Sequence, residues 1–235
     1  MDESVRETGI KYSNAIYAVG GSLYNAYLPV YAGVNKENGL PQYYVDPDNG
    51  DYTITTDYEK AQQSDLGSTL AKVYGGFGTQ LNAYGFDLSV QLSYQLGGKV
   101  YDGTYEALMQ TGDLMGQNFH KDVLKAWTPE NPNSDIPRMN VSDVSSQRMS
   151  SRFLVSSDYL SLNNVTLGYT LPKQWIQKLG VSSLRLYVQG DNLAVFSCRK
   201  GFDPRQYFGL GSSTGSGNFT YSALRTITGG ITLKF

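Results

Sequence analysis

The sequence predicts an all-β fold, in which long antiparallel strands follow one another as a meander and form part of a transmembrane β-barrel. Three observations support this prediction. The composition of the 235 residues favours strands and turns, because Gly (26) and Tyr (19) are frequent while charged residues make up only 17%. Several segments alternate between apolar and polar residues, which is the pattern of a two-faced strand. The segments that join them are alternately short and long, as in outer-membrane barrels.

The clearest strand is expected over residues 86–96, between Gly85 and Gly97. Its eleven residues would cover about 36 Å at roughly 3.3 Å each, and a tilted membrane-barrel strand needs about 9 to 11 residues. A soluble β-sandwich also alternates, but the mean soluble strand is about half as long. We therefore assign the strand to a membrane barrel and expect its apolar positions to face lipid. These positions are Phe86, Leu88, Val90, Leu92, Tyr94 and Leu96.

Two further strands are expected on either side of this one in the sequence. The first covers residues 74–82 and is joined to it by a tight hairpin turn at 83–85 that ends in glycine. The second runs from about residue 159 to 171, and its apolar side chains change phase near Asn163-Asn164. A change of phase within a strand predicts a β-bulge.

The last two strands lie near the end of the chain. One begins at about Leu184, and a second change of phase near residues 190–191 would pass its apolar side to Leu193 and Val195. The other occupies residues 226–235. Its final apolar positions resemble the C-terminal signature by which barrel-assembly machinery recognises its clients, although an ordinary edge strand could also end in Phe. They are Ile231, Leu233 and Phe235.

The segments that join the strands differ in length. Residues 83–85 and 172–182 are short turns, whereas residues 98–158 and 199–222 are long. Outer-membrane barrels have short periplasmic turns and long extracellular loops, so we expect both long segments to be extracellular. The first long loop is expected to carry a short helix through Phe119, Val123, Leu124 and Trp127.

The domain organisation follows from these strands. Residues 1–72 are expected to be an extracellular loop region with its preceding segment, and residues 73–235 to hold about five barrel strands. Five strands cannot close a transmembrane barrel, because such barrels have an even number of strands from eight upward. An open sheet in lipid would leave backbone N–H and C=O groups unpaired, at several kcal/mol each. We therefore expect the chain to be part of a longer protein, with the signal peptide outside it.

Composition argues against several other classes of function. The formal net charge is -2, so the sequence has no electrostatic footprint for nucleic acid. One cysteine and one histidine, His120, leave little for a metal site or for acid–base catalysis. Residues 211–215 match G-x-S-x-G but lack the preceding strand and following histidine of a hydrolase. Residues 46–51 suggest a calcium loop, yet a turn at Asn49-Gly50 explains them better. We predict no catalytic residue, no cofactor, no metal site and no enzymatic activity.

Several segments, in order, resemble the C-terminal barrel region of SusC/RagA-type TonB-dependent outer-membrane transporters. The resemblance covers most of the chain from about residue 18 onward. It is carried by residues 20–24, 31–34, 73–78 (VYGGFG), 84–89 (YGFDLS), 94–102 (YQLGGKVYD), 159–160, 164–172, 184–188, 191–193 and the terminal Phe235.

The resemblance implies a large barrel in the cell outer membrane, surrounded by outer-membrane lipid, of which this chain supplies the last strands. It implies import of oligosaccharides or peptides, together with a SusD-like lipoprotein at the outer face. The family's N-terminal plug and TonB box, which couple transport to the TonB complex, would lie outside this chain. Barrel-assembly machinery is implied as a partner during insertion. A secreted all-β binding or adhesion module remains the alternative, and a glycan-degrading enzyme is a third hypothesis, weakened because no paired-carboxylate signature is evident.

Aromatic residues in the expected loops are candidates for contacts with substrate or partner, because exposed rings can stack on sugars. They are Tyr43, Tyr44, Trp127, Tyr207, Phe208, Phe219 and Tyr221. Tyrosines expected in or near the strands are instead candidates for the aromatic belts at the two membrane interfaces. These are Tyr84, Tyr94, Tyr101, Tyr159, Tyr169 and Tyr187. The sequence leaves both roles open.

Overall fold

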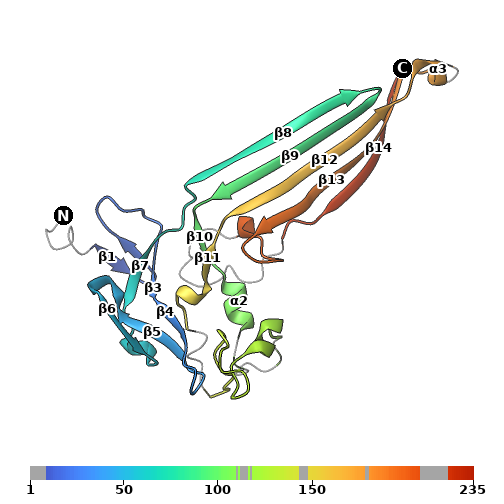
Figure 1. The fold of residues 1–235 in the computed structure, drawn as a ribbon. Helices are drawn as coiled ribbons and strands as arrows, with labels where there is room; N and C mark the ends of the chain where they lie inside the picture. The colour runs from blue at the N-terminus through green and yellow to red at the C-terminus, as the bar shows by residue number, and fades with distance from the viewer. Residues whose placement is uncertain are drawn as a thin grey trace. The chain divides into compact units, whose positions relative to one another are not determined.

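The computed structural model describes residues 9–109, 111, 116, 118–142, 148–177, 180–206 and 222–235 (Figure 1). The chain divides into two compact units. The sheet unit consists of Ala71–Gly98, Ser157–Gln206 and residues 222–235; the loop unit consists of the described residues up to Leu70 and within Lys99–Ser156. Within the described part of the chain, no helix is both long and apolar enough to cross a bilayer.

The sheet unit contains five long antiparallel strands. In spatial order they are β14 (Thr226–Lys234), β13 (Ser183–Ser197), β12 (Tyr159–Thr170), β9 (Phe86–Leu96) and β8 (Val73–Ala83). Each strand lies beside its neighbours in sequence, so the sheet is a meander (Figure 1). The five predicted strands and their antiparallel arrangement are confirmed.

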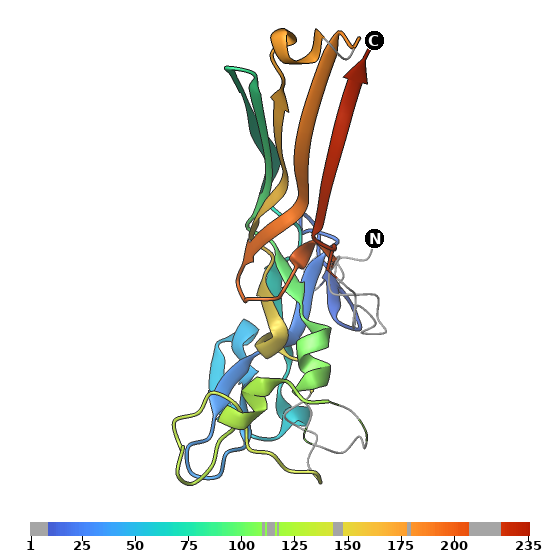
Figure 2. The same ribbon diagram turned by 90° about the vertical axis from the view of Figure 1, so that its right-hand side faces the viewer.

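Two short connections lie at one end of this sheet. Tyr84 and Gly85 join β8 to β9, and both have positive φ angles, 51° and 86°. This is the geometry of a two-residue type I′ hairpin, whose twist matches that of the strands. Between β12 and β13 the described residues include the short helix α3 (Lys173–Ile176), visible beside the strand ends in Figure 2.

The strands β12 and β13 carry irregularities opposite each other. Leu162 pairs with Leu92 and Asn164 with Gln91, so Asn163 is an additional residue in β12 relative to β9. This confirms the predicted bulge. In β13, two residues, 192 and 193, lie opposite Asn163, and Asn192 has a φ of 51°.

The second predicted change of phase, which placed Val195 on the apolar side, is wrong. Val195 pairs with Ser161, whereas Ala194 and Phe196 pair with Leu162 and Leu160. Relative to β9, the strand β12 contains one additional residue at the bulge and β13 contains two. Two additional residues leave the alternation unchanged, so even-numbered residues of β13 face the apolar side both before and after the irregularity.

The chain leaves β9 and returns to β12 at adjacent points. The backbone N–H of Gly97 donates to the Asp158 carboxylate at 2.6 Å, and the N–H of Ser157 donates to the carbonyl of Gly98 at 3.1 Å. The Gln95 side chain also donates to the Ser157 hydroxyl at 3.0 Å. These bonds fasten the two ends of the long connection together at the base of the sheet.

The loop unit is itself folded into small sheets and short helices. One sheet contains β1 (Ile10–Tyr12), β2 (Ala15–Tyr17), β3 (Asn25–Pro29) and β7 (Gln63–Ser68), and another contains β4 (Tyr31–Val34), β5 (Pro41–Asp46) and β6 (Asp51–Thr55). A third pairs β10 (Lys99–Tyr101) with β11 (Leu154–Ser156). The helices are α2 (Gly103–Leu108), η1 (Pro47–Asn49), η2 (Tyr58–Lys60), η3 (Lys121–Lys125) and η5 (Ser151–Phe153). The helix expected through residues 119–127 is only the 3-10 turn η3.

A hydrophobic core lies inside the loop unit. It consists of Leu28, Tyr101, Met109, Ala126, Ile136 and Phe153. Leu28 and Phe153 are completely buried. In the five long strands of the sheet unit, by contrast, no apolar side chain is buried.

Candidate functional site

The five-stranded sheet has one apolar face. Rows of paired residues cross it from strand to strand, such as Phe77, Leu92, Leu162 and Ala194, or Phe86, Tyr169, Leu186 and Ile231. All six positions predicted to face lipid on β9 belong to this face: Phe86, Leu88, Val90, Leu92, Tyr94 and Leu96.

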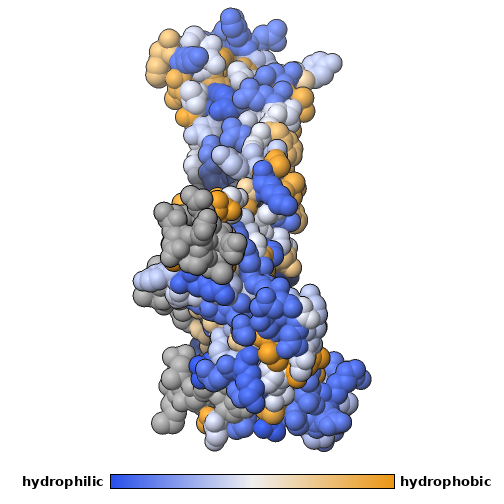
Figure 3. Space-filling model, turned by 90° about the vertical axis from the view of Figure 1, so that its left-hand side faces the viewer, coloured by the Kyte–Doolittle hydropathy of each residue, from blue (hydrophilic) through white to orange (hydrophobic). Residues whose placement is uncertain are grey.

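Many large side chains of the apolar face are exposed. Phe77 is 56% exposed, Val188 56% and Ile227 72%. Figure 3 shows hydrophobic side chains gathered along one margin of the sheet unit, beside hydrophilic ones. A continuous apolar surface of this extent marks a contact with lipid or with another protein surface.

The opposite, polar face carries an ion pair that spans a glycine. Asp87 on β9 pairs with Arg185 on β13, across Gly168 of the intervening strand β12; the Arg185 Nε to Asp87 Oδ1 distance is 2.9 Å. A Cβ at Gly168 would overlap both side chains. The guanidinium of Arg185 also lies 5.0 Å from the ring centroid of Tyr187. A side chain at position 168 would therefore displace the ends of both charged side chains.

Uncharged side chains dominate the same face near the bulge. The Asn164 amide donates to Asp191 at 2.7 Å, and the Gln189 amide donates to the same carboxylate at 3.0 and 3.1 Å. The hydroxyl of Ser93 donates to Asn163 Oδ1 at 3.2 Å. The negative charge of Asp191 is thus stabilised by hydrogen bonds from amides rather than by a cation.

Beyond β13, residues 199–206 fold back over the polar face; we call this segment the strap. Its Arg205 holds Asp203 through two hydrogen bonds of 2.9 and 2.7 Å and donates a third, of 2.8 Å, to the hydroxyl of Ser161 on β12. The Ser197 hydroxyl donates to the carbonyl of Phe202 at 2.6 Å. Ser161 and Asp203 are consequently buried, at 0% and 5% exposed.

The outer edges of β8 and β14 have no strand partner among the described residues. Each offers a row of backbone N–H and C=O groups over 11 and 9 residues. Edges of this length are templates for pairing with further strands.

The predicted aromatic residues of the loops have different environments. Tyr43 is 1% exposed and packs edge-on against Tyr31 and Tyr58, with ring centroids 5.8 and 5.3 Å apart. The prediction that Tyr43 is an exposed platform is therefore wrong, because its ring fills the interior of the loop unit. Tyr44 remains accessible and packs against Tyr52.

Trp127 is half-buried, and its indole N–H donates to the carbonyl of Lys36 at 3.1 Å. The remaining four predicted aromatics lie outside the described residues: Tyr207, Phe208, Phe219 and Tyr221.

Three tyrosines assigned to the membrane belts lie elsewhere. Tyr159 pairs with Gln95 and Ser197 on the polar face. Tyr101 is 4% exposed, in the core of the loop unit. Tyr187 pairs with Gly168 and Gly230 on the polar face, where its ring occupies the space beside Gly230. A belt role is consistent with Tyr84 in the hairpin turn, which is 99% exposed.

One carboxyl group of the loop unit has an unusual environment. Burial raises the pKa of Glu106, on α2, to about 7. Burial likewise raises the pKa of Tyr31 to about 12, against the opposing effect of Arg152. Neither group lies in an arrangement of nucleophile and base.

The other sequence motifs form turns and caps. Asp46 caps η1 by accepting from the N–H of Asn49, and Gly50 follows with a φ of 80°, which confirms the predicted turn. His120 caps η3 by accepting from the N–H of Asp122. Residues 211–215 lie outside the described residues. In the described part of the chain, no three His, Cys, Asp or Glu side chains are grouped to hold a metal ion.

Comparisons with known proteins agree on one family, although no family model matches the chain. The chain is 30% identical, over 92% of its length, to TonB-dependent receptor P3 of Formosa agariphila. It is 26% identical, over 88% of its length, to TonB-dependent receptor SusC of Bacteroides thetaiotaomicron. The chain spans only 22% and 19% of these two relatives.

Solved structures of a RagAB peptide transporter have the same fold. The open-open state of the RagAB peptide importer gives a TM-score of 0.75 at 26% identity, covering 96% of this chain and 24% of that one. A second RagAB structure gives 0.74 at 24% identity, covering 97% and 24%. Similarity therefore extends over both units of the chain.

Proposed function

The chain is a homologue of TonB-dependent receptors of the SusC/RagA type, and from this premise we propose that it forms one segment of the barrel wall of an outer-membrane transporter. The apolar face of its sheet contacts lipid, and the polar face lines the interior. The single observation that carries this proposal is the two-faced sheet of 9- to 15-residue strands, whose apolar face is not buried by any described part of the chain.

The free edges of β8 and β14 support the same proposal. In hydrocarbon every backbone polar group needs a partner, so both edges must pair with further strands. The relatives are several times longer than this chain and could supply such strands. The final residues of β14, with Phe235, serve as the assembly signature.

For the complete protein we propose TonB-dependent import of oligosaccharides or peptides with a SusD-like lipoprotein at the outer face. Residues 1–72, 98–158 and 199–222 then form the extracellular side of the chain, and the strap folds back from that side onto the interior, polar face. Support comes from the family and from the peptide transporter among the structural neighbours. The exposed residues Phe119 and Leu124 of the loop unit, 46% and 91% exposed, are available to such a lipoprotein.

A secreted binding or adhesion module would need to cover the apolar face with a second layer. The described residues contain no such layer over the five strands, so we favour the membrane barrel.

Labelling of single cysteines in the full-length receptor tests the orientation. Tyr84→Cys lies in the hairpin turn, and Tyr52→Cys lies on β6, with Tyr52 64% exposed. In a background with Cys198 replaced by serine, we expect a membrane-impermeant maleimide to label position 52 on intact cells. Position 84 should react only after the outer membrane is permeabilised. Labelling of position 84 but not 52 on intact cells would refute the orientation.

A further inference from the structure

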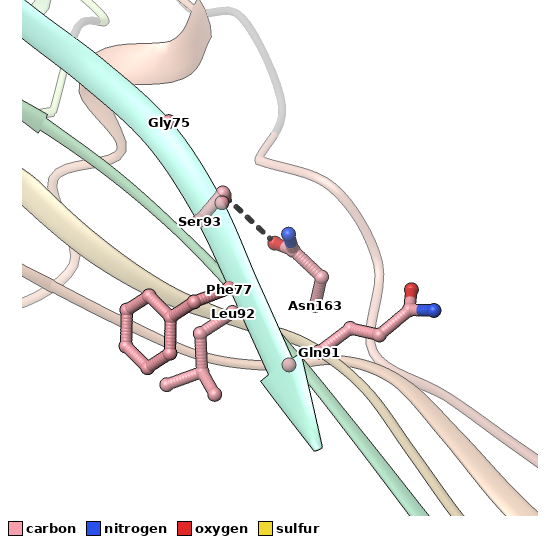
Figure 4. A pocket seen from close by; sticks show the side chains of 8 residues that line it. Gly75, Phe77, Gln91, Leu92, Ser93 and Asn163 are labelled. Carbon is pink, nitrogen blue, oxygen red and sulfur yellow. Dashed lines mark hydrogen bonds between the residues drawn. The ribbon is translucent and has the colours of Figure 1, made fainter. Parts of the chain in front are cut away.

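The polar face of the sheet contains a hollow beside β8, one of the two edge strands. Its volume is about 530 Å³, and its lining includes Gly76 and Gly78. Gly76 pairs with Ser93 and Gly78 with Gln91, so both glycines occupy polar-face positions where any other residue would place a side chain. Figure 4 shows Phe77 and Leu92 on one side of β8, with Gln91 and Asn163 on the other. The hollow is therefore the space left by two missing side chains of an edge strand.

Elsewhere in the sheet, glycines are covered by large side chains, most of them from a paired strand. A Cβ at Gly230 would overlap the ring of Tyr187, its partner on β13. A ring that lies over a glycine in this way helps to fix the register of the two strands. The other covered glycines are Gly75, beneath Tyr94, Gly168, beneath Asp87 and Arg185, and Gly190, beneath Leu193.

Gly76 and Gly78 have no such cover among the described residues. The one atom within 4 Å of a Cβ at Gly76 would be the backbone oxygen of Leu92, at 3.1 Å. At Gly78 the nearest atoms would be the backbone oxygen of Val90, at 2.7 Å, and the Cγ of Gln91, at 3.6 Å. The close approach of β9 favours glycine at both positions but leaves their polar side bare.

The bare glycines lie in a strand whose outer edge has no strand partner among the described residues. On the other edge strand, the uncovered Gly229 lies on the apolar face, where lipid chains can cover it. A paired strand covers the glycines elsewhere on the polar face, so we expect the strand that pairs with the edge of β8 to cover Gly76 and Gly78. Directly opposite Cβ atoms in an antiparallel pair are about 4.5 to 5.5 Å apart, and an aromatic ring also reaches the diagonal neighbour.

The lining of the hollow favours a particular kind of side chain. It contains no charged residue. Asn163 Oδ1 accepts a hydrogen bond from Ser93, while its amide N–H groups and the exposed amide of Gln91 can bind a further group. A ring with a polar tip can lie on the glycine backbone and form a hydrogen bond with these amides.

We propose that the strand which pairs with the free edge of β8 places a tyrosine or tryptophan over Gly76 and Gly78, so that the hollow is filled at the seam between two strands of the barrel wall. The inference rests on the proposed function, because it takes the sheet as part of a closed barrel. It deepens that function by specifying the partner at this edge.

Photo-crosslinking in the full-length receptor tests the source of the covering side chain. A benzoylphenylalanine in place of Gln91, which lines the hollow, would lie beside the bare glycines. We expect mass spectrometry to find the crosslink on the strand that pairs with β8, within two residues of a tyrosine or tryptophan. The matched control carries the probe in place of Thr228, on the polar face of the other edge strand, and should not crosslink to that strand. A crosslink from position 91 to any other segment, the N-terminal plug included, would overturn the proposal, as would the absence of a crosslink.

Two substitutions of one glycine test whether the hollow is filled. Gly76→Ala adds only a Cβ, which meets the Leu92 oxygen, whereas Gly76→Leu adds further atoms that enter the hollow. We expect Gly76→Leu to weaken the folding equilibrium about 5-fold to 150-fold more than Gly76→Ala, because its additional atoms collide with the ring. Replacing the crosslinked aromatic residue by alanine should remove most of this difference. Equal stability of the two variants, or a difference that the alanine replacement leaves unchanged, would contradict the proposal.

Heat-modifiable electrophoretic mobility scores membrane insertion separately for every protein. A wild-type receptor that inserts but crosslinks elsewhere overturns this inference and leaves the barrel wall intact. Failure of wild type to insert refutes the proposed function itself, and the inference with it.

Discussion

Replacing Leu92 by arginine should prevent stable insertion of the receptor into the outer membrane. Leu92 is the seventh of the eleven residues of β9, close to the middle of the strand, and it pairs with Phe77 and Leu162 on the apolar face. An arginine at the bilayer midplane on the lipid face of a barrel costs about 2 to 4 kcal/mol. This corresponds to a loss of about 30-fold to 1,000-fold in the folding equilibrium.

The neighbouring residue provides the control. Gln91 lies on the polar face, paired with Gly78 and Asn164, so Gln91→Arg changes the same strand by the same side chain. We expect it to cost less than about 1 kcal/mol, because its guanidinium can remain in water. The assay is urea titration of the full-length receptor in lipid vesicles, followed by heat-modifiable mobility. Equal destabilisation by the two variants would refute the assignment of faces, and wild-type stability of Leu92→Arg would refute the membrane barrel.

Three further predictions concern other parts of the chain. Gly168→Ala should displace the ion pair that spans it and lower the unfolding midpoint by an amount equivalent to at most about 1 kcal/mol. Gly229→Ala should be tolerated, because its Cβ would meet no atom closer than 4.0 Å; equal effects of the two variants would contradict the close contacts at Gly168. Because burial raises the pKa of Glu106 from 4.5 to about 7, the loop unit should lose stability as pH rises between these values, by up to about 3 kcal/mol. Glu106→Gln should remove this dependence in hydrogen exchange, and an unchanged pH dependence would rule the carboxyl out. Deleting Phe235 should reduce the amount of inserted, heat-modifiable receptor, and insertion at the wild-type level would exclude an assembly signature.

The long strands could be predicted from the sequence wherever one face of the sheet is apolar and the other polar, because apolar and polar residues then alternate along the chain. The strand expected over residues 86–96 coincides with β9, because each side chain there meets either apolar or polar surroundings. The bulge at Asn163 could also be predicted, since one additional residue shifts the phase. Val195 was assigned to the wrong face because β13 contains two additional residues, which leave the faces of the following residues unchanged. The number of additional residues cannot be read from the local alternation of apolar and polar side chains.

The loop unit could not be predicted in the same way. Its strands contain only three to six residues, and several pairs shift register. Such short segments show no measurable period. The burial of Tyr43 depends on rings contributed by β4 and η2, so it follows from tertiary packing rather than from the local sequence.

The hydrogen bonds from Gly97 to Asp158 and from Ser157 to Gly98 fix both ends of the long connection between β9 and β12. Its two ends meet at fixed, neighbouring points, so its length and content can change without altering the register of the strands. The entropic cost of closing a loop rises only slowly with its length. Residues 99–156 share a hydrophobic core with Leu28 and Leu66, so natural variation or engineering that exchanges this connection has to match that core, while the register of the long strands stays the same.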